Sequence, residues 1–264
     1  MNFKLLFPTY RTRFRFVLDS IGEITKGGRV NAMLNVGSGE GDIDPSLSAF
    51  AHELSSCDIN EGDVAHARAA NAHVGNITYS VENAEALRFG SDRFDLVTCL
   101  ELIEHVSDSQ KVIHEIARVL KPAGSAIITC PSATFPATYD PINRALAPLG
   151  KHVSMGAYGY GHSWLVKEED VEGWFAHADL SIVKKERLTG ALAGAVECYW
   201  PGLLQKMLKP NAGNVARDEK KRGIRASAGD PPLVAITDAL VAADRALFSN
   251  SERAVGLAYV VTKS

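Results

Sequence analysis

Several features that would mark other classes of protein are missing from this sequence. The four cysteines form no Cys-x-x-Cys pair, and Cys57, Cys99 and Cys130 lie in or beside apolar, strand-like runs. A thiol in such a run acts as a small hydrophobic side chain, which is typical of a reduced protein. No uncharged apolar stretch has the length of a signal peptide or of a membrane span, so a cytoplasmic protein is expected.

A strong excess of charge of either sign is also missing. Lys and Arg number 28 against 31 Asp and Glu, and the net charge of −3 argues against a protein that coats nucleic acid. Lys and Arg are in local excess over 206–225, just after an apolar segment at 199–204. Residues 196–225 are therefore a candidate for peripheral contact with an anionic membrane, or for holding an anionic substrate; a solvated loop is the alternative.

What the sequence does have is a regular alternation of strand and helix patterns, with enough apolar residues (46%) for a sizeable core. Strands are predicted at 30–36, 54–59, 77–81, 94–100, 125–130, 180–188 and 254–262, and helices at 9–26, 61–73, 107–120 and 167–177. The alternation predicts an α/β fold with a doubly wound, Rossmann-like, seven-stranded sheet. We expect it to be mostly parallel, with an antiparallel last strand and insertions after strands 5 and 6.

A single domain is predicted, built around one cofactor-binding core. Its parts are an N-terminal helix (1–28), the core (30–131), an active-site cover (131–166), a helical insertion (190–250) and the last strand (254–263). Two local details are also predicted. Asp44 should cap a short helix that begins at Pro45, and Ser107 should begin the helix after the fourth strand.

The core opens with a glycine-rich turn after its first strand. Gly37, Gly39 and Gly41 stand at alternate positions, which differs from the G-x-G-x-x-G of dinucleotide folds and from the phosphate-binding P-loop. Asp58 ends the second strand, 21 positions after Gly37, where a carboxylate can accept hydrogen bonds from both ribose hydroxyls. A nucleoside-containing cofactor is therefore expected.

At this point the sequence resembles the class I S-adenosylmethionine-dependent methyltransferases. The resemblance is carried by the segments 34–41, 57–59, 82–89, 94–97 and 119–124, in the family's order. It implies S-adenosylmethionine as the cofactor. The residues that it implies as cofactor-binding are Gly37, Ser38, Gly39, Asp58, Ile59, Asn83, Ala84 and Glu101.

Three positions need comment against the family's pattern. Asn83 stands where the family usually has Asp, but an amide can still accept a hydrogen bond from the adenine amino group. Ala123 replaces a usual Gly in a structural turn, which should matter little. Asp95 lies at the N-terminal end of its strand, away from the edge where ligands bind, so a structural role is expected.

A cluster of chemically active residues, Glu101 to His105, follows the fourth strand directly. If this segment begins a helix, Glu101, Glu104 and His105 share one face, and a divalent cation would relieve the repulsion between the carboxylates. The stretch resembles that of the ubiquinone-biosynthesis O-methyltransferases, and its Glu-x-x-Glu-His pattern also marks the metal-dependent small-RNA 2′-O-methyltransferases. The resemblance points to His162 as a further ligand, because His162 follows the fifth strand shortly before a helix.

The sequence thus predicts a site for Mg, Mn, Fe, Co or Zn made by Glu101, Glu104, His105 and His162, which would lower the pKa of the attacked hydroxyl. In the metal-free alternative, His105 or His162 is the general base, Glu101 touches the cofactor and Glu104 caps a helix.

Three functions remain open at this stage. The favoured one is O-methylation of a small-molecule or lipid-linked acceptor such as a phenol, a catechol, a quinone precursor or a lipid-linked sugar. The second is RNA 2′-O-methylation, which the acidic net charge and the absence of an added RNA-binding domain disfavour. The third is a non-catalytic cofactor-binding partner protein, which the intact glycine turn and the acidic cluster disfavour. Nucleic acid is therefore not the expected partner.

Overall fold

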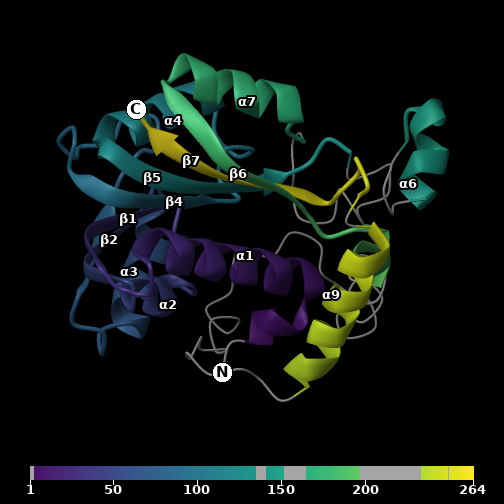
Figure 1. Cartoon of the computed structure of the whole chain (residues 1–264), viewed down its shortest axis with the longest axis horizontal. Coiled ribbons are helices and arrows are strands. Elements are labelled where there is room, and N and C mark those ends of the chain that lie inside the picture. Colours follow the sequence, from purple (N-terminus) through teal and green to yellow (C-terminus); the bar gives the residue numbers. More distant parts are fainter. Residues whose placement is uncertain (1–2, 135–140, 152–164, 197–232, 249) are drawn as a thin grey trace. The chain divides into compact units, whose positions relative to one another are not determined.

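The structure, a computed structural model, describes residues 3–134, 141–151, 165–196, 233–248 and 250–264 (Figure 1). The chain divides into two compact units. One comprises Met1–Thr12, Ser132–Leu165 and Arg187–Gly256, and the other comprises Arg13–Pro131, Val166–Glu186 and Leu257–Ser264. The second unit holds nearly the whole sheet.

The sheet has seven strands in the order β3-β2-β1-β4-β5-β7-β6. Their bounds are β1 Val30–Val36, β2 Ala51–Asp58, β3 Ile77–Val81, β4 Phe94–Leu100, β5 Leu120–Pro131, β6 Leu180–Leu188 and β7 Gly256–Lys263. The order reverses between β1 and β4, so the carboxyl ends of these two central strands flank a topological switch point, where open α/β sheets bind ligands.

The directions of the strands confirm the predicted fold. β1 pairs in parallel with β2 and β4, β2 with β3, and β4 with β5. β7 is antiparallel to β5, because the N–H of Ser132 donates to Val255 O near the start of β7, whereas Thr262 Oγ1 donates to Gly124 O near its end. The sheet is therefore mostly parallel with an antiparallel last strand.

The helices are α1 Pro8–Thr25, α2 Asp44–Ser48, α3 Glu61–Ala70, α4 Ser109–Val119, α6 Pro141–Leu146, α7 Glu168–His177 and α9 Val234–Phe248, and short 3₁₀ turns cover Phe3–Leu6 and Ala147–Leu149. Helices of the second unit lie on both faces of its sheet. In Figure 1, α4 and α7 lie on one face, where they contact each other, and α2 and α3 lie on the other. Among the described residues, no helix combines the length and the apolar character needed to cross a bilayer.

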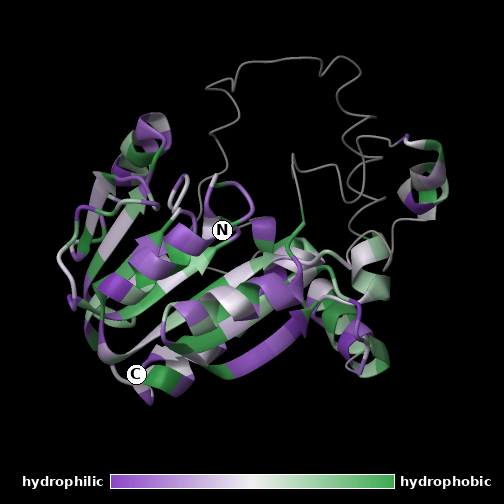
Figure 2. Cartoon of the chain, turned by 90° about the horizontal axis from the view of Figure 1, so that it is seen from above, coloured by the Kyte–Doolittle hydropathy of each residue, from purple (hydrophilic) through white to green (hydrophobic). Residues whose placement is uncertain are grey.

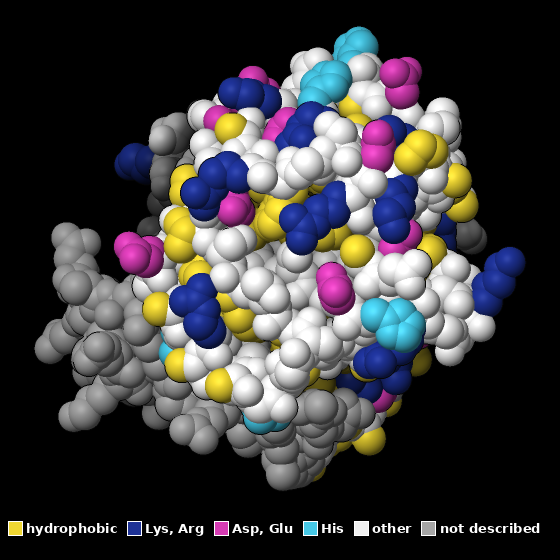
Figure 3. Space-filling view, turned by 90° about the vertical axis from the view of Figure 1, so that its left-hand side faces the viewer, with side chains coloured by type: hydrophobic (Ala, Val, Ile, Leu, Met, Phe, Trp, Pro, Cys, Tyr) yellow, Lys and Arg dark blue, Asp and Glu magenta, His cyan; other side chains and the backbone are white. Residues whose placement is uncertain are grey.

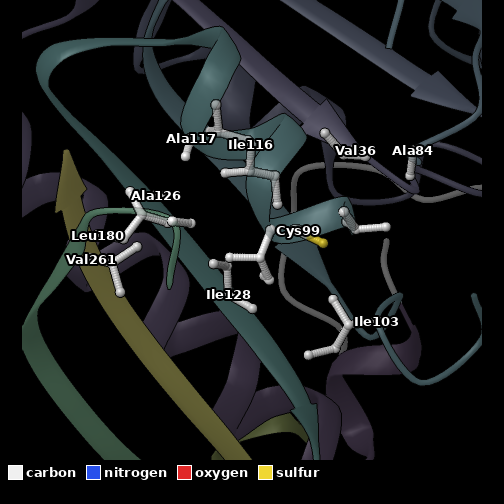
Figure 4. Packing of buried hydrophobic residues seen from close by; sticks show 14 of the residues in the cluster. Val36, Ala84, Cys99, Ile103, Ile116, Ala117, Ala126, Ile128, Leu180 and Val261 are labelled. Carbon is white, nitrogen blue, oxygen red and sulfur yellow. The ribbon is translucent and has the colours of Figure 1, made fainter. Parts of the chain in front are cut away.

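β4 lies at the centre of the core and is buried along most of its length. Its Cys99 packs with Ile128 of β5 and with Ile116 of α4, and Ile103 belongs to the same cluster (Figure 4). Cys57, Cys99 and Cys130 are free and buried, and burial raises the pKa of Cys57 to about 12, so these thiols pack as hydrophobic groups. Cys198 lies outside the described residues.

Two predicted details of the helices are wrong. Asp44 is the first residue of α2 rather than its cap, because its carboxylate is fully buried and accepts hydrogen bonds from Asn35 and Ser56 instead. The helix after β4 begins at Ser109, and Asp108 is its cap through a hydrogen bond from Lys111 N. Ser107 is drawn instead to the carboxylate of Glu85.

Charged side chains of both signs lie on the outside of the fold. The edge strand β6 carries Lys184, which pairs with Glu23, and Lys185, which pairs with Glu168 and Glu172. The charged part of β6 is drawn in the hydrophilic colour in Figure 2. Charged side chains on an edge strand discourage pairing with another chain. On the face in Figure 3, cationic and anionic side chains are interspersed rather than grouped by sign.

The turn before the body of β5 allows a direct test of backbone strain. Ala123 has φ 59°, a left-handed conformation that favours glycine, and a Cβ on Gly124 would lie 2.8 Å from Lys121 O. Ala123→Gly should therefore raise the free energy of unfolding by up to about 1 kcal/mol, and Gly124→Ala should lower it by about 1 kcal/mol or more. Urea denaturation measures both. Equal destabilisation by the two substitutions would contradict the assigned strain.

Candidate functional site

The glycine turn joins β1 to α2 and is folded back onto the end of β2. The N–H groups of Gly37 and Ser38 both donate to Cys57 O, at 2.8 and 3.0 Å. All three glycines have positive φ, of 75°, 52° and 73° in chain order. Because other residues are strained in this conformation, the alternate glycines are what allows the turn to form.

The space beside each glycine differs. A Cβ on Gly37 would lie 2.9 Å from the side chain of Leu102, and one on Gly41 would lie 2.8 Å from Ala67 Cβ. A Cβ on Gly39 would meet no atom of the residues that the structure describes within 4 Å. Gly41 is therefore required by packing against Ala67, and a Cβ on Gly37 would displace the side chain of Leu102. Within the described residues, the space beside Gly39 is open and could take a ligand.

Asp58 lies at the carboxyl end of β2 and faces this turn. Its Oδ2 accepts a hydrogen bond from Gly39 N at 2.8 Å, and its Oδ1 accepts one from Asn60 N at 2.9 Å. Asn60 in turn caps α3 through Gly62 N and Asp63 N. The next residue, Ile59, keeps 69% of its surface exposed, which is unusual for a large apolar side chain directly after a buried strand.

A buried polar network lies beneath the turn. Asp44 accepts hydrogen bonds from Asn35 Nδ2 at 2.7 Å and from Ser56 Oγ at 2.8 Å, and Thr98 Oγ1 donates to Asn35 Oδ1 at 2.9 Å. Burial raises the pKa of Asp44, which these hydrogen bonds oppose. The network ties β1, β2 and β4 to the start of α2, directly under Gly41.

The predicted adenine-side residues lie in a tight turn after β3. Ala86 N donates to Asn83 O at 2.9 Å, and Glu85 N donates to Asn83 Oδ1 at 2.9 Å. Ala84 is buried in the core cluster. The amide of Asn83 thus stabilises its own turn through one lone pair of its oxygen, which leaves the second lone pair and the Nδ2 donors for a ligand.

The segment from Glu101 to His105 forms a bend and a turn, so the condition that it begins a helix is not met. Glu101 has φ 52°, because its N–H donates to Thr129 O and its Oε1 accepts from Thr129 Oγ1 at 3.0 Å. Its Oε2 lies 2.9 Å from Arg13 Nη1 of α1. The carboxylate of Glu101 is therefore held by a neighbouring strand and neutralised by a helix distant in sequence.

Glu104 and His105 lie side by side but in contrasting surroundings. The side chain of Glu104 is fully buried, and neither of its oxygens accepts a hydrogen bond from any residue the structure describes. Burial, with the charge of Glu101 adding to it, raises the pKa of Glu104 to about 9. His105 keeps 44% of its side chain exposed, and its Nε2 lies 3.7 Å from Glu104 Oε1.

The described part of this cluster does not form a metal centre. No group of three or more His, Cys, Asp or Glu among the described residues could hold an ion. Two of the predicted ligands have other environments, since Glu101 is paired with Arg13 and Glu104 is buried. His162, the fourth predicted ligand, lies outside the described residues, as do most of the predicted cover and of 196–225.

Asp95 was correctly assigned a structural position, because it accepts hydrogen bonds from Ala32 N and Lys121 Nζ at the opposite end of β4 from the candidate site.

Three other residues near the candidate site were not recognised from the sequence patterns. Missed were the buried hub Asp44, the ion-pair partner Arg13, and Glu85, which reaches Ser107. The sequence showed Arg13 only as one of several basic residues in α1, and nothing in that run indicated that Glu101 is its ion-pair partner.

The buried carboxyl of Glu104 should give stability a distinctive dependence on pH. Its folded pKa of about 9 lies above the ordinary value of 4.5, so its contribution is fully present below pH 4.5 and is lost as the pH rises toward 9. The wild type should therefore lose stability relative to Glu104→Gln between about pH 5 and pH 9 in chemical denaturation.

A matched control for that measurement is Glu115→Gln. The hydrogen bond from Arg118 lowers the pKa of Glu115, so its difference from the wild type should develop on the acid side. A difference between the wild type and Glu104→Gln that stays constant from about pH 5 to pH 9 would contradict the assigned burial.

Comparison with known proteins finds similarity to methyltransferases over the core of this chain. Residues 34–128 match the methyltransferase domain family. The ubiquinone biosynthesis O-methyltransferase of Coxiella burnetii is 33% identical over 127 residues, which cover 46% of this chain and 54% of the relative. The ubiquinone/menaquinone biosynthesis C-methyltransferase of Yersinia pestis is 28% identical over 211 residues, covering 73% of this chain and 81% of the relative.

A solved structure extends the fold comparison over most of the chain. Phosphoethanolamine N-methyltransferase 2 of Haemonchus contortus, in complex with S-adenosyl-L-methionine, has a TM-score of 0.56 and 16% identity, over 93% of this chain and 52% of that chain. The chain spans about half the length of the O-methyltransferase relative. The likeness to this solved structure concerns the fold, and the match to the methyltransferase domain family covers residues 34–128.

Proposed function

We propose that the protein is an S-adenosylmethionine-dependent methyltransferase that methylates an oxygen of a small-molecule or lipid-linked acceptor. The observation that carries the proposal is the pairing of an open space at Gly39 with a carboxylate, Asp58, whose two oxygens are already oriented by Gly39 N and Asn60 N. A cradle of this kind fits a nucleoside cofactor at the carboxyl ends of β1 and β2.

On this proposal, Gly37, Ser38 and Gly39 lie along the methionine part of the cofactor and Asp58 holds the ribose. Each oxygen of Asp58 accepts one backbone hydrogen bond, and a carboxylate oxygen can accept a second from a ribose hydroxyl. The backbone bonds fix the carboxylate before the ligand arrives, so that little side-chain entropy is lost on binding.

The adenine would lie between Ile59 and the turn at Asn83 and Ala84. The exposed side chain of Ile59 offers an apolar face to the ring. The unused lone pair of Asn83 Oδ1 can accept the adenine amino group, and Asn83 Nδ2 can donate to a ring nitrogen. A neutral amide can make both contacts, so Asn in place of Asp is compatible with binding.

The acceptor side is formed by Glu101 and His105, and Glu104 lies buried next to His105. When bound, S-adenosylmethionine supplies an electrophilic methyl group that passes to the acceptor oxygen as neutral S-adenosylhomocysteine departs. His105 is the candidate general base, because its half-exposed imidazole can reach an acceptor hydroxyl and hold the released proton at Nε2, 3.7 Å from Glu104 Oε1. Glu101, fixed by Arg13 and Thr129, borders the same edge of the sheet.

A divalent metal remains a prediction of the Glu-x-x-Glu-His pattern alone. Glu101, Glu104, His105 and His162 would be its ligands, yet the described three do not fit a site as they stand. The metal-free base is therefore favoured. The relatives named above act on oxygen, on carbon and on nitrogen, so the choice of oxygen rests on the base beside the acceptor edge rather than on the fold.

Calorimetry with S-adenosylmethionine tests the cofactor part of the proposal. The wild type should bind, and Asp58→Asn should bind at least about tenfold more weakly, because one of its two backbone partners would then face an amide NH₂. The matched control is Asp92→Asn, at an exposed carboxylate paired with Lys263. No binding by a folded wild type, or an equal loss in both variants, would refute the assignment.

Labelled methyl donor tests the acceptor. Incubation with small-molecule, lipid and RNA fractions should place the label in one of the first two as a methyl ether. His105→Gln should lower kcat by about a hundredfold, whereas His114→Gln, at an exposed position on α4, should not. Label in RNA would instead support RNA 2′-O-methylation, and loss of activity in EDTA with recovery on adding Mn²⁺ or Mg²⁺ would support the metal.

A further inference from the structure

The turn after β3 and the turn after β4 are joined by one side chain. Glu85 Oε1 accepts hydrogen bonds from Ser107 N at 2.9 Å, Ser107 Oγ at 2.7 Å and Asp108 N at 3.0 Å. Three donors therefore converge on a single carboxylate oxygen. These hydrogen bonds lower the pKa of Glu85, as expected where they favour the charged form.

Each end of this connection lies beside a different part of the candidate site. At one end, the N–H of Glu85 is held by Asn83 Oδ1, so the side chain starts from the predicted adenine turn. At the other end, Ser107 and Asp108 come directly after the turns that carry Glu104 and His105. Asp108 is also the cap of α4, through Lys111 N.

Among the described residues, the segment 102–109 is held by the core on its inner side and by Glu85 on its outer side. Its inner side is fixed, because Ile103 is buried in the core and its carbonyl accepts from Ser109 Oγ at 2.7 Å. His105 N donates to Leu102 O at 2.8 Å. Glu85 supplies the contacts at Ser107 and Asp108, which lie on the exposed side of the same stretch.

We propose that Glu85 is a positioning residue that couples occupancy of the adenine turn to the geometry of the Glu101–His105 turns. This inference rests on the proposed function, because it needs a nucleoside ligand at Asn83 and Ala84. A ligand that orders Asn83 orders Glu85 through the Asn83–Glu85 hydrogen bond, and Glu85 then steadies Ser107 and Asp108 and with them His105. Two backbone N–H groups and a hydroxyl at the start of a helix favour a carboxylate in this place.

A second carboxylate, Glu115 of α4, ties that helix to Leu87, just after the turn that follows β3, and provides a matched control. Glu115 Oε2 accepts from Leu87 N at 2.8 Å, and Glu115 also pairs with Arg118. This contact lies further along α4 and does not touch Ser107 or Asp108. Glu115→Ala should therefore loosen the connection between the two elements without breaking the link to the His105 turn.

Amide hydrogen exchange with and without S-adenosylhomocysteine tests the coupling. In the wild type and in Glu115→Ala, the ligand should slow exchange both at 83–86 and at 105–109, by about tenfold. In Glu85→Ala, slowing should persist at 83–86 but fall to about twofold or less at 105–109. Glu85→Gln keeps an acceptor oxygen and should restore most of the effect. With an acceptor in hand, Glu85→Ala should lower kcat more than it raises the KM for the cofactor.

The outcomes separate this inference from the proposed function. If the ligand binds Glu85→Ala and slows exchange at 105–109 as it does in the wild type, the coupling is wrong and the cofactor assignment stands. If Glu115→Ala loses the effect as fully as Glu85→Ala does, the role assigned to Glu85 is also overturned. If the folded wild type does not bind S-adenosylhomocysteine, the cofactor assignment fails and the coupling fails with it.

Discussion

The buried carboxylate of Asp44 is the interaction on which the candidate site depends. It joins Asn35 of β1 and Ser56 of β2 at the point where the glycine turn leaves the sheet. A Cβ on Gly41 would lie 3.0 Å from Asp44 Oδ2, so the turn can pass over this network only because glycine stands there. The path of the backbone then brings Gly39 N to Asp58. Packing beneath the turn therefore fixes the polar groups above it, and the proposed cofactor cradle is formed before any ligand binds.

In the acidic cluster, the carboxylates of Glu101 and Glu104 lie close together at the edge of a buried sheet, where two negative charges would repel each other. The two groups have different surroundings, which removes this repulsion. Glu101 is neutralised by Arg13, and Glu104 is buried where its pKa is raised to about 9, so that it carries a proton at neutral pH. The arrangement leaves His105 as the exposed titratable side chain of the three. The proposed general base, His105, therefore lies next to a carboxyl group whose burial favours its neutral form.

Much of the fold follows from local patterns, whereas the site follows from them only in part. The apolar runs and the alternate glycines predicted the order of strands and helices and the position of Asp58, because burial and positive φ leave direct signals in a sequence. The turn geometry of Glu101, the hub role of Asp44 and the start of α4 at Ser109 were not predictable. Each depends on a partner far away in sequence: Thr129 and Arg13 for Glu101, Ser56 for Asp44, and Glu85 for Ser107.

The glycine turn and Asp58 are proposed to hold the cofactor. A crystal structure of the protein with S-adenosylhomocysteine tests it most directly. The account predicts both ribose hydroxyls within hydrogen-bonding distance of the Asp58 carboxylate, the homocysteine part beside Gly39, and the Gly39–Asp58 and Asn60–Asp58 hydrogen bonds unchanged from those described here. A ligand bound elsewhere, or a ribose that contacts Asp58 only after these two backbone hydrogen bonds have broken, would contradict it.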